Sequence, residues 1–146
     1  MSNIITLPYE PRQTQLSIHE LIQTHRFSVI VAHRRLGKTV CTINELIRSA
    51  LCDSSGNGRY GYVAPFRSQA KSIAWDYVKY FTQPVPGRAV NEGELAVDFP
   101  NGARIRLFGA DNPDAMRGLY FDGVILDEVA DMKPEVWGVN NSSCTE

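Results

Sequence analysis

The sequence has few cysteines, no long apolar run and almost no net charge. Its three cysteines form no paired metal-binding pattern, so reduced thiols in a cytoplasm fit best. No apolar stretch approaches the ~20 residues that cross a bilayer, and the first residues lack the basic and apolar regions of a secretory signal. The formal net charge of −1 gives no electrostatic footprint for nucleic acid. This composition predicts an ordinary globular domain of 146 residues, with no membrane contact.

The hydrophobic pattern predicts an α/β fold. Three continuous apolar runs predict strands buried on both faces: residues 27–32 (FSVIVA), 60–64 (YGYVA) and 123–126 (GVIL). Three stretches have apolar residues at helical spacing: about 13–24, 40–51 and 70–81. Alternating residues on either side of Pro100-Asn101-Gly102 predict a hairpin. Strands that alternate with helices favour a mostly parallel sheet flanked by helices.

Residues 32–39 (AHRRLGKT) match the Walker A phosphate loop from its second glycine onward. Backbone N–H groups and the start of a helix bind phosphate in such a loop, and Gly37 is needed where a Cβ atom would collide. Lys38 is predicted to reach the β- and γ-phosphates of ATP, and the Thr39 hydroxyl to bind Mg²⁺. Ala32 departs from the pattern, which has glycine there. A chance match in a surface turn is the alternative, but a predicted strand before the loop and a helix after it favour phosphate binding.

A second acidic motif follows the last predicted strand. Residues 123–126 run directly into Asp127 and Glu128, as in a Walker B motif. Asp127 is predicted to hold Mg²⁺ through water, and Glu128 to activate the attacking water as general base. The alternative, acidic residues that merely end a strand, is weaker because the same chain carries the phosphate loop.

Together these motifs resemble the ATPase domain of the tailed-phage terminase large subunit, a DNA-packaging motor. The resemblance spans about Pro8 to Trp137 and rests on AHRRLGKT and on two further stretches, FPNGARIRLFGADNPDAMRG and GVILDEVADMKPEVW. It implies a RecA-like P-loop NTPase fold of the additional-strand type, with ATP and Mg²⁺ as ligands. It also implies double-stranded DNA, a small terminase subunit and a portal as partners, a homo-oligomeric ring, and action in the cytoplasm of a bacterial host.

The resemblance also implies roles for individual residues. Gln15 corresponds to an adenine-recognising glutamine, and an exposed glutamine at a helix start is the equal alternative. Arg34 corresponds to a catalytic arginine that contacts the γ-phosphate. A solvated basic residue is the alternative, but a guanidinium beside a loop shaped for anions favours the phosphate contact. Arg35 is a weaker candidate of the same kind. Arg117 either links nucleotide state to a neighbouring strand or is an ordinary loop arginine. The full nucleotide-binding set in this interpretation is Gln15, His33, Arg34, Arg35, Leu36, Gly37, Lys38 and Thr39.

The match ends at Trp137. Residues 1–137 are therefore expected to form a partial ATPase domain, incomplete at its C-terminal end, and residues 138–146 a disordered polar tail. The strand that this family inserts between the Walker A and Walker B strands, and the C-terminal nuclease, have no counterpart in the sequence. We therefore expect these 146 residues alone to hydrolyse little or no ATP.

Two other functions remain open at this stage. A non-catalytic or prophage remnant would share every residue up to Trp137. A superfamily 2 helicase fragment would share the glutamine and both Walker motifs, but Val129-Ala130-Asp131 after Glu128 departs from the usual helicase motif.

Overall fold

The computed structural model describes residues 6–31 and 36–132. Its helices are α1 (Gln13–Thr24), α2 (Lys38–Leu51), α3 (Arg67–Gln69), the π-helical η2 (Ala70–Trp75), α4 (Asp76–Thr82), and the 3-10 turns η3 (Pro113–Met116) and η4 (Val129–Asp131). Its strands are β1 (Arg59–Ala64), β2 (Ala89–Asn91), β3 (Ala96–Asp98), β4 (Arg104–Gly109) and β5 (Gly123–Leu126). None of the helices within these described ranges has the length and apolar character that a bilayer crossing requires.

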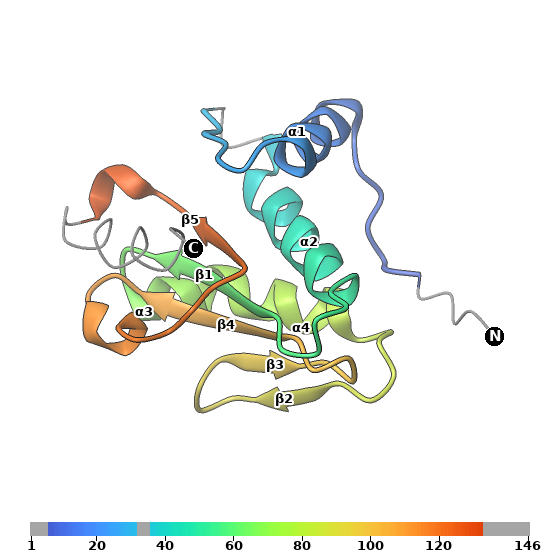
Figure 1. Ribbon diagram of the computed structural model, residues 1–146. Helices are drawn as coiled ribbons and strands as arrows, with labels where there is room; N and C mark the ends of the chain where they lie inside the picture. The colour runs from blue at the N-terminus through green and yellow to red at the C-terminus, as the bar shows by residue number, and fades with distance from the viewer. Residues whose placement is uncertain (1–5, 32–35, 133–146) are drawn as a thin grey trace.

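The five strands form one mixed sheet in the order β2-β3-β4-β1-β5 (Figure 1). Strand β1 lies between β4 and β5 and is parallel to both, as the alternation of strands and helices predicts. The predicted hairpin is confirmed, because β3 and β4 pair antiparallel around the Pro100-Asn101-Gly102 turn. The short edge strand β2, which the sequence pattern does not predict, pairs antiparallel with β3.

The main core lies between one face of the sheet and the helices. α2 and the continuous helical run from α3 to α4 cover this face and meet side chains of β1, β3 and β4. Its largest fully buried members include Trp75, Tyr62, Ile43, Ile47, Ile105 and Leu107. A smaller cluster on the opposite face joins Val63 and Phe108 to the segment that carries Met116 and Phe121. The apolar pattern of each element explains this packing. The apolar residues of α2 recur at helical spacing and form its buried face, and the continuous apolar run of β1 is buried on both faces of the sheet.

The strand predicted at residues 27–32 is wrong over the part that the structure describes. Residues 27–31 form no ladder, and Phe27, Val29 and Val31 are 67%, 89% and 93% exposed. A strand needs a neighbour for its backbone N–H and C=O groups, and β1 already pairs on both sides with β4 and β5. The outer edge of β5 pairs with no strand among the described residues. Residues 27–31 therefore have no neighbouring strand with which to form a ladder.

Candidate functional site

The start of α2 and the end of β5 lie close together at the edge of the sheet (Figure 1). Lys38 is the first residue of α2, and the Thr39 hydroxyl in that first turn donates a hydrogen bond to Asp127 Oδ2 at 3.5 Å. Asp127 follows β5 directly, and its N–H donates to the carbonyl of Val63 in β1 at 2.9 Å. The structure thus brings together two residues, Thr39 and Asp127, that the sequence assigns to one metal site. The free N–H groups of the helix start add a positive partial charge at the same place.

Gly37 turns the chain into α2. Its φ of 75° lies in the left-handed region, where residues with a Cβ atom are disfavoured. A Cβ atom added there would lie 2.8 Å from Gln15 Nε2 and 2.9 Å from Arg12 Nη2. The backbone conformation therefore favours glycine at this position, whereas the two close contacts are with the ends of flexible side chains, which can shift.

Tyr62 is a site residue that the sequence analysis missed. Its side chain is 1% exposed, and its hydroxyl donates to Asp127 Oδ2 at 2.5 Å. Burial, and then the neighbouring Asp127 carboxylate, raise the pKa of Tyr62 above its ordinary value, so the hydroxyl keeps its proton. Tyr62 and Thr39 together orient one oxygen of Asp127. The sequence does contain an indication of this role: a tyrosine in a strand that is predicted to be buried needs a hydrogen-bond partner for its hydroxyl.

Glu128 adopts an unusual backbone conformation next to Asp127. Its φ is 53° and its ψ is 49°, a left-handed conformation that costs non-glycine residues about 1–3 kcal/mol. The turn is closed by a hydrogen bond from Asp131 N–H to the Glu128 carbonyl at 3.0 Å. The side chain is exposed. This placement leaves the carboxylate accessible to solvent beside Asp127.

The donor atoms fit Mg²⁺. A hydroxyl and a carboxylate oxygen are the hard ligands that Mg²⁺ prefers, and two adjacent oxygens on one octahedral Mg²⁺ lie about 3 Å apart. The 3.5 Å between Thr39 Oγ1 and Asp127 Oδ2 is close to that spacing. In the parts of the chain that the structure describes, no cluster of three or more His, Cys, Asp or Glu side chains could hold a metal by itself. Such an ion would therefore depend on water and phosphate oxygens for its other ligands.

Gln15 lies against the loop instead of in solvent. Its side chain is 4% exposed, so the interpretation as an exposed glutamine is wrong. Its Nε2 donates to the carbonyls of Gly37 at 3.2 Å and Leu36 at 3.4 Å, and its Oε1 accepts from the Arg12 N–H at 2.9 Å. Arg12 Nη2 also donates to the Leu36 carbonyl, at 2.8 Å. Leu36 and Gly37 are thus held by α1.

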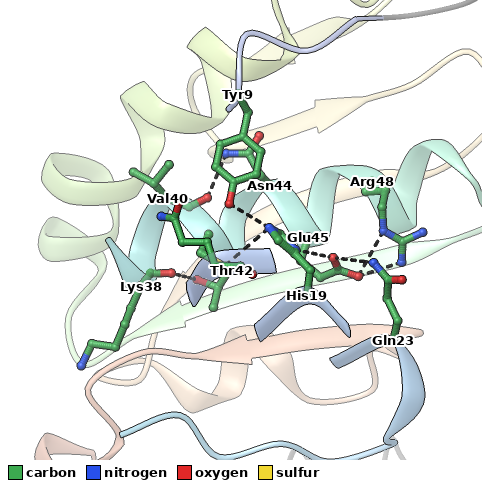
Figure 2. Close-up of polar contacts among 11 residues, drawn as sticks. Tyr9, His19, Gln23, Lys38, Val40, Thr42, Asn44, Glu45 and Arg48 are labelled. Atoms are coloured by element: carbon green, nitrogen blue, oxygen red, sulfur yellow. Dashed lines mark hydrogen bonds and ion pairs between the residues drawn. The ribbon is translucent and has the colours of Figure 1, made fainter. Parts of the chain in front are cut away.

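A polar cluster joins α1 to α2, and we call its members Tyr9, His19, Gln23, Glu45 and Arg48 the α1–α2 cluster (Figure 2). His19 Nδ1 lies 2.6 Å from Glu45 Oε2, and Tyr9 Oη lies 2.8 Å from His19 Nε2. Arg48 Nη2 donates to Glu45 Oε1 at 2.7 Å, and Gln23 Nε2 to Glu45 Oε2 at 3.3 Å. The His19 side chain is only 13% exposed because it fills the space between the two helices.

Opposing effects set the pKa of Glu45 at the centre of this cluster. Burial raises it, but hydrogen bonds from Arg48, His19 and Gln23 and the Arg48 charge outweigh burial, so the net pKa is lowered. Glu45 is therefore ionised near neutral pH. An ionised carboxylate only accepts hydrogen bonds, so in its contact with Glu45 the Nδ1 of His19 is the donor.

The remaining candidate residues are His33, Arg34, Arg35 and Arg117. His33, Arg34 and Arg35 fall outside the described residues, so their assignments stay predictions. Arg117 follows η3 and pairs with Asp114 at 3.3 Å, with both side chains more than 70% exposed. This surface pair agrees with an ordinary loop arginine and does not test the other interpretation.

Comparison with solved structures identifies the fold. The ATPase domain of the large terminase of Thermus phage P74-26 superposes with a TM-score of 0.77 at 22% identity, over 95% of this chain and 62% of that domain. The large terminase of another thermophilic bacteriophage, solved in complex with ADP, gives 0.74 at 14% identity, over 94% of this chain and 36% of that protein. No protein-family model and no curated protein sequence matches. The chain therefore has the P-loop NTPase fold of large terminase ATPase domains and spans less than two thirds of each of these chains.

Proposed function

We propose that this chain is the nucleotide-binding part of a terminase-type ATPase, which couples ATP hydrolysis to DNA translocation. One observation carries the proposal: Thr39, directly after Gly37 and Lys38, meets Asp127 at 3.5 Å where α2 begins and β5 ends. A fold that superposes on large terminase ATPase domains supports the same function.

Each residue has a distinct role in this proposal. Lys38 neutralises the β- and γ-phosphates, and its side chain extends away from the α1–α2 cluster in Figure 2. Thr39 and Asp127 hold Mg²⁺, which would supply charge neutralisation at the phosphates. Glu128 accepts a proton from the attacking water, which its exposed carboxylate can reach. The resemblance assigns residues 33–36 to the same loop and assigns Arg34 a contact with the γ-phosphate.

The larger assembly is proposed on resemblance alone. Double-stranded DNA, a small terminase subunit, a portal and a ring of identical subunits are the expected partners. Residues 1–137 would form part of the ATPase domain, and residues 138–146 would lie outside it. The ADP complex of the second terminase compared above supports ATP as the nucleotide for this chain.

One observation favours a second candidate function, a non-catalytic remnant with weak nucleotide binding. The segment before the phosphate loop is exposed and joins no ladder among the described residues, so the sheet does not hold the loop from that side. The start of α2 and the contacts from α1 hold the other side.

The test is Mg-ATP binding by titration calorimetry on wild-type protein, Lys38→Ala and a control, Lys71→Ala. Lys71 is an exposed lysine in the helical run from α3 to α4. The proposal expects a loss of affinity in Lys38→Ala and none in Lys71→Ala. Equal affinities in all three proteins would refute the assignment of the phosphate site. Binding without turnover in a chain extended to full domain length would favour the remnant.

A further inference from the structure

The hydrogen bonds of Gln15 leave little of its amide for a ligand. A glutamine amide has two N–H donors and one carbonyl oxygen. Both donors are directed at backbone carbonyls of the loop, those of Leu36 and Gly37, and the oxygen already accepts from Arg12 N–H. The side chain is also 4% exposed. Recognition of adenine would need a donor that is available, and both are in use.

The Leu36 and Gly37 carbonyls that Gln15 contacts determine where the following N–H groups point, and the Gly37 carbonyl also accepts from Cys41 N–H in α2 at 3.0 Å. In a trans peptide the C=O and the following N–H point in opposite directions. The Leu36 and Gly37 carbonyls point towards α1, so the N–H groups of Gly37 and Lys38 point away from α1. These are the N–H groups at the start of α2, where an anion is favoured.

α1 is positioned firmly enough for this role. The His19–Glu45 contact at 2.6 Å joins the middle of α1 to α2. The Cys41 thiol lies 3.7 Å from the Gln15 carbonyl, and Ile18 is buried. The helix that carries Gln15 is therefore fixed to the same helix that begins at the phosphate loop.

We propose that Gln15 is a positioning residue for the phosphate loop and does not recognise the base. It holds the Leu36 and Gly37 carbonyls so that the following N–H groups face the phosphates. The proposal rests on the proposed function, because it assigns a role within that same nucleotide site.

The first experiment compares ligands with and without a base. Binding of Mg-ATP, Mg-GTP and Mg-tripolyphosphate is measured by calorimetry for wild type, Gln15→Ala and a control, Gln13→Ala, which removes an exposed glutamine from the same helix. The loss of hydrogen bonds to two half-buried carbonyls predicts roughly tenfold weaker binding of all three ligands in Gln15→Ala. A loss for Mg-ATP alone, with tripolyphosphate unchanged, would show that Gln15 contacts the base and would overturn the proposal.

The second experiment needs no ligand. The Cys41 N–H donates to the Gly37 carbonyl at 3.0 Å, so its hydrogen exchange reports the position of that carbonyl. We expect faster exchange at Cys41 in Gln15→Ala, with exchange in the second half of α2 unchanged. An unchanged Cys41 rate, or a rise spread evenly over α1 and α2, would show that Gln15 does not position the loop. If wild type binds none of the three ligands, the proposed function fails, and this exchange measurement still decides the role of Gln15.

Discussion

Tyr62→Phe is the most informative single substitution in this structure. It removes one hydroxyl, which donates to Asp127 Oδ2 at 2.5 Å, and keeps the ring that packs in the main core. A hydrogen bond to a charged group contributes about 1.5–3 kcal/mol to stability. Asp127 is half-buried, so water can replace part of this interaction, and we expect a loss of about 1.5 kcal/mol.

The same strand offers a matched control. Tyr60 lies two residues earlier on β1, faces the same core, and donates to Asp53 Oδ2 at 2.7 Å. Asp53 belongs to the loop after α2 and not to the candidate site. Tyr60→Phe should therefore also lower the free energy of unfolding but leave Mg-ATP binding unchanged. Tyr62→Phe should change the Mg²⁺ dependence of nucleotide binding, because Asp127 loses a group that orients it.

The assay is urea unfolding at pH 7 with a double-mutant cycle. Tyr62→Phe, Asp127→Asn and the double variant are compared, and the coupling energy is the departure from additivity. We expect a coupling of about 1–2 kcal/mol between Tyr62 and Asp127. A coupling near zero, or a Mg²⁺ dependence that matches the Tyr60→Phe control, would refute the conclusion that Tyr62 orients the metal-binding carboxylate.

Three further predictions follow from the structure. Because the pKa of Glu45 is lowered in the folded protein, Glu45 stabilises the fold above the pKa of an unfolded glutamate (about 4.3), and this stability is lost as pH falls through the folded pKa. Glu45→Gln should therefore flatten the acid side of a stability–pH curve measured by urea unfolding. Burial raises the pKa of the Cys41 thiol, whereas Cys52 is exposed. In a Cys144→Ser background, iodoacetamide at neutral pH should therefore modify only Cys52, which mass spectrometry of digested peptides would show. Equal labelling of Cys41 would contradict its burial. In a chain extended to full domain length, Glu128→Gln should abolish most phosphate release and preserve ATP binding, since glutamine cannot accept the proton, and retained turnover would place the base elsewhere.

Local spacing in the sequence was sufficient to predict most of the individual elements. α2 buries one face at helical period, and the apolar runs at residues 60–64 and 123–126 became β1 and β5. α1 forms over the predicted residues, but it buries Gln15 and Ile18 and leaves Leu16 and Leu21 exposed. The hairpin turn also carries a strong local signal, and its Asn101 side chain caps the end of α2 by donating to the Ala50 carbonyl at 2.8 Å. The positions of Gly37, Lys38 and Thr39 at a helix start follow from the phosphate-loop motif itself.

The contacts between these elements were decided by tertiary structure. Residues 27–31 are as apolar as β1, yet they form no strand, because a strand depends on a neighbour that local sequence does not specify. Gln15 and Tyr62 are ordinary residues of a helix and a strand by their pattern. Their roles arise only when the packing of α1 on α2 brings Gln15 to the Gly37 carbonyl, and the register of β1 with β5 brings Tyr62 to Asp127. The sequence determined which residue types stand at the ends of helices and strands, and packing between distant segments determined which of those residues meet, because hydrogen bonds depend on positions within a few tenths of an ångström.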